Sequence, residues 1–269
     1  GVSLPKATSK AEALTGMVDA FRSLTPLSLE DVVTYIMDQT GAYKISGIRR
    51  RVSSLSRLHE MMGFTPFSHA KAVQLSLKSA AKSNLHTGNT PTLTPATMLV
   101  SIIAQLASIK KGRTYVRDKA IVLVGFYGAF RRAELAGFRL SDLQREEDGY
   151  TIYISVSKTD QTGQGRYAYL PVKGGEFCPC AALDAYLAER KEAAVLFGLS
   201  DKGIARAIKR VLGSEVQAHS LRAGFVTQAR MNGATNMEIM AQTGHRDSKS
   251  VDRYTRHIDA KKHNAVNKL

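Results

Sequence analysis

Cysteine and long apolar runs are scarce in this sequence, and their scarcity excludes several classes of protein. The chain has two cysteines, Cys178 and Cys180, which are separated by a single proline. Cysteines this close cannot form an ordinary structural disulfide, and no second thiol pair completes a zinc site. The longest apolar runs, such as 120–124 and 98–106, are far shorter than the ~20 residues that cross a bilayer. We therefore expect no disulfide scaffold, no metal site and no membrane span.

Acidic residues are also few compared with basic ones. The 269 residues include 38 Lys and Arg against 23 Asp and Glu, which gives a formal net charge of +15. Such an excess, without a long basic tail, favours a polyanion such as DNA or RNA as the partner. The N-terminal residues lack the basic and then apolar pattern of a secretory signal, so a reducing, cytoplasmic setting is expected. The length suits two domains, and the 43% hydrophobic content is that of a folded protein.

Apolar residues at helical spacing predict three amphipathic helices in the first third of the chain. The first helix begins after Ser28, a residue suited to an N-cap, and places Val32 and Ile36 on one face. The second covers about 45–62 and the third about 69–83. Basic residues on these helices could form half of a clamp around duplex DNA, although each taken singly is also compatible with a merely solvated face. They are Arg49, Arg50, Arg57, Lys71, Lys78 and Lys82.

A segment at 85–94 separates this helical bundle from the rest of the chain. It has no periodicity and collects Gly, Pro, Asn and Thr, which is typical of a linker. We predict a helical domain at 1–84 and a mixed α/β second domain at 95–269, whose β-hairpin is formed by 150–157 and 166–170. The predicted helices of the second domain cover 95–109, 115–127, 181–192, 202–212, 221–232 and 237–242, with a short one after Asp259. The expected fold class is therefore mainly α with a small β-hairpin or sheet.

Three clusters carry residues suited to phosphate chemistry. In the first, Arg131 precedes Glu134 by three residues; its guanidinium fork matches phosphate oxygens, and the ordinary alternative is a surface ion pair. In the second, His219 and Arg222 are spaced to share a helix face, with His245 following a glycine. The ordinary alternative for these histidines is a structural role.

The third cluster is a tyrosine between arginines near the C-terminal end. Tyr254 follows Arg253 and precedes Arg256 by two residues. A tyrosine becomes a nucleophile only where cationic neighbours favour its phenolate or a base accepts its proton. Taken singly, Tyr254 is more typical of a partly buried anchoring residue.

The order and spacing of these clusters change that interpretation. The series is Arg131-x-x-Glu134, a hairpin with Ser157, Lys158 and Thr159, then His219-x-x-Arg222, Gly244-His245 and Tyr254. It resembles the catalytic domain of the tyrosine recombinase (phage integrase) family over about 94–254. The N-terminal helices at 27–82 are similar to the core-binding domain of its Cre-like members. The alternatives are a type IB topoisomerase, which shares these residue types, and a DNA-binding protein without catalytic activity.

The resemblance implies a role for each matched residue. Arg131 and Arg222 would hold the scissile phosphate, and Glu134 would support an arginine or histidine. Tyr254 would attack phosphorus to form a 3′-phosphotyrosyl link, and Lys158 would protonate the departing 5′ oxygen. His219 and His245 would hydrogen-bond to phosphate, and His219 could accept the tyrosine proton. No metal or other cofactor is implied.

The resemblance also implies partners and a location. The substrate would be double-stranded DNA with recombination sites, whose integration, excision or resolution the protein would catalyse as part of a mobile element. A homotetramer on DNA is expected, held together by a tail helix, although only fifteen residues (269 minus 254) follow Tyr254. The expected location is the cytoplasm, at the nucleoid.

Overall fold

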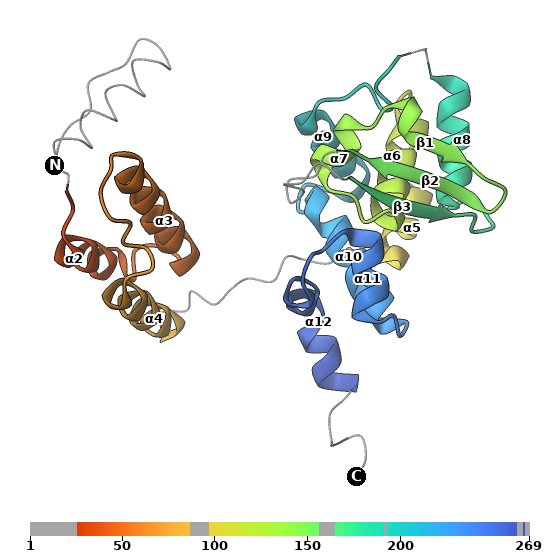
Figure 1. Ribbon diagram of the computed structural model, residues 1–269. Helices are drawn as coiled ribbons and strands as arrows, with labels where there is room; N and C mark the ends of the chain where they lie inside the picture. The colour runs from red at the N-terminus through yellow and green to blue at the C-terminus, as the bar shows by residue number, and fades with distance from the viewer. Residues whose placement is uncertain (1–25, 87–96, 156–164, 191–192, 263–265, 267–269) are drawn as a thin grey trace. The chain divides into compact units, whose positions relative to one another are not determined.

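The protein is described by a computed structural model that covers residues 26–86, 97–155, 165–190, 193–262 and 266. The chain divides into two compact units, Gly1–Thr92 and Leu93–Leu269, and each is described by itself (Figure 1). Most of the predicted linker, 85–94, lies outside the described residues. Residues 85 and 86 were predicted as linker but end a helix.

The N-terminal unit contains helices α2 (Leu29–Gln39), α3 (Ile45–Met61) and α4 (Lys71–His86). The predicted N-cap of α2 is confirmed: Ser28 Oγ accepts the Asp31 N–H at 3.1 Å, and the Asp31 carboxylate accepts the Ser28 N–H at 2.9 Å. Val32 and Ile36 are buried, as their spacing predicts. They pack into one apolar core with residues of the other two helices, namely Ile48, Val52, Phe67, Val73, Leu77 and Ala80.

A buried histidine that the sequence did not single out ties the ends of this bundle together. His59 accepts the Leu27 N–H on Nε2 at 3.1 Å, and its Nδ1 lies 2.9 Å from the Thr65 carbonyl. Because a carbonyl can only accept, Nδ1 carries the proton and the ring is the neutral Nδ1–H tautomer. His59 therefore fixes the chain segments that enter α2 and leave α3.

The C-terminal unit is built around α6 (Tyr115–Tyr127). Its residues 120–124 are completely buried, and α8, α9 and α10 pack around it. The buried carboxylate of Asp118 on α6 accepts from Arg210 on α9 at 2.7 Å, which links two helices across the core. The other helices are α5 (Leu99–Ser108), α7 (Arg132–Gly137), α8 (Pro179–Glu189), α9 (Asp201–Leu212), α10 (Ala218–Met231), α11 (Asn236–Thr243) and α12 (Ser248–Lys262).

A small antiparallel sheet lies beside these helices in Figure 1. Strand β2 (Gly149–Ile154) pairs with β1 (Leu143–Arg145) and with β3 (Arg166–Pro171), in a register that sets Ile154 opposite Arg166. The predicted hairpin is confirmed, whereas β1 was not predicted because three residues cannot show a periodicity. Residues 156–164, which carry the predicted turn and Lys158, lie outside the described residues.

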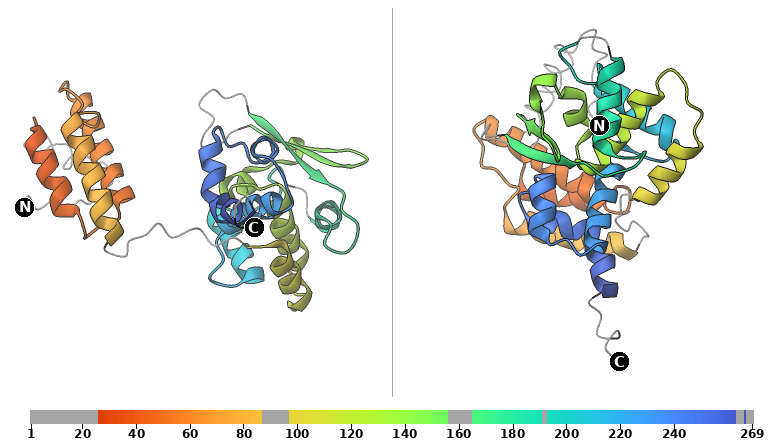
Figure 2. Two further views of the ribbon diagram at one scale, coloured as in Figure 1. Left: turned by 90° about the horizontal axis from the view of Figure 1, so that it is seen from below. Right: turned by 90° about the vertical axis from the view of Figure 1, so that its right-hand side faces the viewer.

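Three helices near the site differ from the sequence-based prediction, and one of them, α7, was not predicted at all. Helix α10 begins at Ala218, three residues before the predicted start, so His219 lies within it. The predicted short helix after Asp259 is wrong, because α12 already begins at Ser248 and includes Tyr254. The buried positions of α12, Val251, Thr255 and Ile258, include a threonine, so a search for apolar periodicity alone misses this helix. Its C-terminal end leads away from the rest of the unit (Figures 1 and 2).

The mainly helical fold with a small sheet confirms the predicted fold class. Within the described part of the chain, no helix has both the length and the apolar character that crossing a bilayer requires.

Candidate active site

The candidate site begins at a strained turn that follows α6. Ala129 has a φ of +50°, in the left-handed region, which costs a residue with a Cβ about 1 kcal/mol. The preceding residue, Gly128, cannot be replaced by a larger residue without a clash, because a Cβ there would lie 2.0 Å from the Phe130 ring. The turn aims the Ala129 carbonyl at Arg222, whose Nη1 donates to it at 2.6 Å. The strained turn therefore holds one end of the Arg222 guanidinium.

Arg131 and Glu134 stand at the start of α7. Glu134 accepts the Arg131 backbone N–H at 2.8 Å with one carboxylate oxygen and the Arg131 guanidinium at 2.7 Å with the other. The ion pair considered from the sequence is thus present. It is not a surface pair, because only 3% of the Glu134 side chain is exposed. Burial and two simultaneous bonds hold Arg131 in one orientation.

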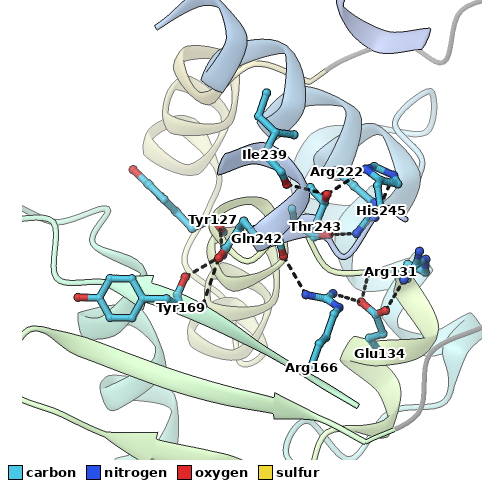
Figure 3. A network of polar contacts seen from close by, with 11 residues as sticks. Tyr127, Arg131, Glu134, Arg166, Tyr169, Arg222, Ile239, Gln242, Thr243 and His245 are labelled. Atoms are coloured by element: carbon cyan, nitrogen blue, oxygen red, sulfur yellow. Dashed lines mark hydrogen bonds and ion pairs between the residues drawn. The ribbon is translucent and has the colours of Figure 1, made fainter. Parts of the chain in front are cut away.

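Arg222, on α10, is the largest fully buried side chain among the described residues. Burial and the neighbouring charge of Arg131 lower its pKa to about 10, so the guanidinium stays charged at neutral pH. Besides Ala129, it contacts His245, with Nη2 3.0 Å from the histidine Nε2 (Figure 3). A buried charge with these fixed partners is preorganised, which is the property that an anion-binding group requires.

His245 follows α11, and both of its ring nitrogens have partners. Because Arg222 can only donate, Nε2 of His245 accepts and Nδ1 carries the proton. Nδ1 donates to Thr243 Oγ1 at 2.9 Å, and that hydroxyl donates to the Ile239 carbonyl at 2.7 Å (Figure 3). Burial, helped by the charges of Arg222 and Arg131, lowers the pKa of His245 to about 4. The ring is therefore neutral at physiological pH.

His219 and Tyr254 come together from α10 and α12. Their Nε2 and Oη atoms are 2.6 Å apart. Desolvation and the charges of Arg222 and Arg131 lower the pKa of His219 below its usual value, which favours the neutral ring. A neutral Nε2 can accept the tyrosine proton, so the pair has the geometry of a nucleophile and its base. The Tyr254 ring also stacks beside His245, with centroids 6.3 Å apart.

Arg166, at the start of β3, was placed in a strand by the sequence but given no role. Its Nη2 lies 3.3 Å from Glu134 Oε2, and its Nη1 donates to the Gln242 carbonyl at 2.8 Å (Figure 3). Its side chain is 16% exposed. Nothing in its sequence surroundings distinguishes it from the many other arginines, because its partners are 32 and 76 residues away.

The charges of the site do not cancel. Arg131, Arg166 and Arg222 contribute three positive charges and Glu134 one negative, which leaves two positive charges on these four side chains. A cavity of about 870 Å³ opens beside them, lined by Arg131, Glu134 and His219 among others. Arg222, His245 and Tyr254 are not part of its lining. The arrangement suits an anion that enters from the cavity.

The remaining predicted site residues divide into two groups. Lys158 lies outside the described residues. The six basic residues of the N-terminal unit are all exposed. Three of them, Arg49, Arg57 and Lys78, line one groove of about 690 Å³ between α3 and α4, whereas the other three, Arg50, Lys71 and Lys82, are not in its lining.

Comparison with known proteins identifies the family. Residues 97–261 match the phage integrase family. An "Integrase/recombinase xerD homolog" of Selenomonas ruminantium is 31% identical over 270 residues, 91% of this chain and 78% of that protein. The chain belongs to the phage integrase family. It is a site-specific tyrosine recombinase, as its sequence predicts, and the alternatives of a type IB topoisomerase and of a non-catalytic DNA-binding protein are not favoured.

Solved structures of this family share the fold. A XerH site-specific recombinase, in a post-cleavage complex with a palindromic difH substrate, is 19% identical with a TM-score of 0.67, covering 96% of this chain and 78% of its own. The Tn1549 transposon integrase, in complex with circular intermediate DNA, is 14% identical with a TM-score of 0.59, covering 93% and 90%. At these low identities the similarity shows that the fold is shared.

Proposed function

We propose that this integrase-family protein uses Tyr254 as its nucleophile, His219 as the base that accepts the tyrosine proton, and Arg131 with Arg222 as the phosphate clamp. The observation that carries the proposal is the 2.6 Å contact between Tyr254 Oη and His219 Nε2, beside a buried arginine. The lowered pKa of His219 supports it, because only the neutral ring can accept a proton.

The charge balance of the site fits this reaction. A phosphodiester carries one negative charge, and the oxygen of Tyr254 brings a second once its proton has passed to His219. The net charge of +2 on the arginine cluster matches the resulting dianionic transition state. The Oη–P bond forms as the P–O5′ bond breaks, and on the family resemblance Lys158 supplies the proton to O5′. Attack by a 5′ hydroxyl reverses these steps and rejoins the strand, so bond energy is conserved.

His245 has a more specific role in this proposal than the resemblance implies. Its Nε2 accepts from Arg222 and its Nδ1 donates to Thr243, so neither nitrogen is available to donate to phosphate in this arrangement. His245 orients Arg222 before DNA binds. A direct bond from His245 to phosphate would require the ring to exchange partners on DNA binding.

Double-stranded DNA with recombination sites is the proposed partner. The XerH and Tn1549 structures are complexes with DNA, and the exposed arginines and lysines of the N-terminal unit offer contacts to phosphates. Integration, excision or resolution of a mobile element would be the outcome, in the cytoplasm at the nucleoid. The affinity for DNA should fall as the salt concentration rises, because each phosphate contact releases counterions.

A homotetramer on DNA is the proposed assembly. The C-terminal end of α12 leads away from its own unit, which leaves it able to contact another copy (Figure 2). Light scattering of the protein on DNA that carries its recombination sites should show species larger than one protomer per site. A single protomer per site, with no higher species, would contradict the assembly.

A covalent adduct tests the nucleophile. Footprinting on DNA that flanks the gene would first locate a recombination site, and a nicked suicide version of that site would then trap the 3′-phosphotyrosyl protein on a denaturing gel. Tyr254→Phe should abolish the adduct without abolishing DNA binding. Tyr167→Phe is the matched control, because Tyr167 is an exposed tyrosine of the same unit outside the lining of the cavity, and it should keep the adduct. An adduct that survives Tyr254→Phe would refute the assignment.

A further inference from the structure

One arginine joins parts of the site that are distant in sequence. Arg166 begins β3, and its two terminal nitrogens bind partners on two other elements: Glu134 on α7 and the main-chain carbonyl of Gln242 on α11 (Figure 3). Glu134 is also the carboxylate that holds Arg131. Gln242 lies three residues before His245. A single guanidinium therefore connects the support of the first clamp arginine with the turn that carries His245.

The turn after α11 is shaped to receive this guanidinium. Gly244 ends α11 with a φ of +68°, and its N–H donates to the Met240 carbonyl at 2.7 Å. A Cβ on Gly244 would lie 2.5 Å from both Cδ and Nε of Arg166. Glycine is thus required both by its backbone angle and by the close approach of the arginine. Arg166 and the turn before His245 fit each other.

A second set of contacts fixes the same two elements in one register. The side-chain amide of Gln242 donates to the Tyr169 carbonyl at 2.7 Å and to the Tyr127 carbonyl at 3.0 Å, and its oxygen accepts the Tyr169 N–H at 3.2 Å. These bonds hold the last turn of α11 on the edge of β3. Arg166 then connects this contact between α11 and β3 to Glu134, and so to α7.

We propose that Arg166 is a positioning residue for the recombination reaction. It sets the placement of Arg131 relative to the Arg222–His245 pair by holding Glu134 and the C-terminal turn of α11 on one guanidinium. The proposal rests on the proposed function of Arg131 and Arg222 as a phosphate clamp. Arg166 itself does not touch the reacting atoms; it acts through Glu134 and Gln242.

Only an arginine suits both contacts. Its planar fork presents two terminal nitrogens in different directions, whereas the single ammonium of lysine keeps the charge but cannot reproduce that geometry. Glutamine at this position would remove the charge, leave Glu134 balanced by Arg131 alone, and reduce the net charge of the cluster from +2 to +1. We therefore expect a graded series, with Arg best, Lys intermediate and Gln worst.

Single-turnover cleavage with a suicide DNA substrate measures this series. At saturating DNA, Arg166→Gln should lower the cleavage rate by about 100-fold, because a small misplacement of catalytic groups costs that much. Its Kd for the same DNA should stay within about threefold, since phosphate contacts elsewhere dominate affinity. Arg166→Lys should recover part of the rate. Arg145→Gln, in the same sheet on β1 and exposed, is the control and should cleave like the unaltered protein.

A DNA substrate with a neutral scissile phosphate distinguishes two causes of a lower cleavage rate: a misplaced phosphate clamp and a general loss of structure. A methylphosphonate at the scissile position removes one negative charge, so a well-placed arginine pair matters less. The ratio of rates between the unaltered protein and Arg166→Gln should shrink at least tenfold on this substrate if Arg166 acts through the clamp. A ratio that is the same on both substrates would overturn the proposal, because a general loss of structure affects both equally.

Failure of this proposal and failure of the proposed function give different results. If the unaltered protein forms no Tyr254-dependent adduct, the proposed function is wrong. If that adduct forms and Arg166→Gln cleaves as fast as the Arg145→Gln control, Arg166 does not position the clamp. The thermal unfolding temperatures of Arg166→Gln and Arg145→Gln are measured alongside their cleavage rates. If Arg166→Gln unfolds at the assay temperature, Arg166→Lys decides instead, and a rate within twofold of the unaltered protein on the native phosphate overturns the proposal.

Discussion

The basic residues of the two units differ in what surrounds them. In the N-terminal unit the six predicted DNA-contacting side chains are exposed, and Arg57 forms an ion pair with Glu60 that is open to solvent. In the C-terminal unit Arg131, Arg166 and Arg222 are largely or fully buried and bind named carbonyl, carboxylate and imidazole groups. The two units therefore use positive charge in different physical ways.

This difference has consequences for substitution. Exposed charges contact DNA phosphates in water, so the contribution of each one is modest and sensitive to salt. Buried arginines act through fixed geometry in surroundings where removing one partner leaves another unsatisfied. Substitutions in the first group should change affinity, and substitutions in the second should change the rate of the chemical step.

Among the substitutions of basic residues, the largest effect is expected at Arg222. Arg222→Gln removes the buried charge and should lower single-turnover cleavage by about 10²–10³-fold, as loss of one preorganised donor does elsewhere. The pKa of His245 should rise above about 4 in an NMR titration, because the charge of Arg222 contributes to its lowering. Arg230→Gln, on the same helix, is the control. A cleavage rate that Arg222→Gln leaves unchanged would contradict the idea that buried arginines act on the chemical step and exposed ones on affinity.

The next effect concerns the pH dependence of cleavage. Because the pKa of His219 is lowered, the ring is neutral at pH 7 and able to accept a proton. The rate should be flat between pH 7 and 8 and should fall as the pH drops through a value below 6.5. His219→Gln should remove this acid limb and lower the plateau by about 10²-fold. At saturating DNA, His69→Gln, in the groove of the N-terminal unit, should keep the acid limb. An acid limb that persists in His219→Gln would exclude His219 as the base.

A smaller effect is expected from the groove of the N-terminal unit. Replacing its three basic residues, Arg49, Arg57 and Lys78, with Gln should lower DNA affinity. It should also reduce the slope of log affinity against log salt by about 2.7, at about 0.9 per phosphate contact. The matched triple of Arg50, Lys71 and Lys82 removes the same charge outside the groove lining and should change the slope by less than about one. Equal losses in both triples would show that charge alone matters.

The smallest effect tests how independently the two units are stabilised. Ser28→Ala removes the capping box of α2 and should destabilise that helix by about 1 kcal/mol. Hydrogen exchange of α2 amides should accelerate about fivefold, whereas exchange in α6 of the other unit should not change. Acceleration in both units would show that they unfold together.

The elements that the sequence predicted well are those with strong local signals. The N-cap at Ser28, the burial of Val32 and Ile36 on α2, and the hairpin strands follow from periodicity and capping chemistry within a few residues. Helix α12 was missed because its buried face includes Thr255, and β1 because it is too short to show alternation. Local patterns cannot report what a residue packs against.

For the candidate site, the sequence determined the family and the residue types, because Arg131, His219, Arg222, His245 and Tyr254 occur in a recognisable order. It also determined the excess of positive charge. Only the tertiary structure decided that Glu134 is shared by two arginines, that His245 accepts from Arg222, and that Arg166 belongs to the cluster. The reason is physical: hydrogen-bond partners, burial and pKa values depend on groups up to 76 residues apart in the chain, which only folding brings together.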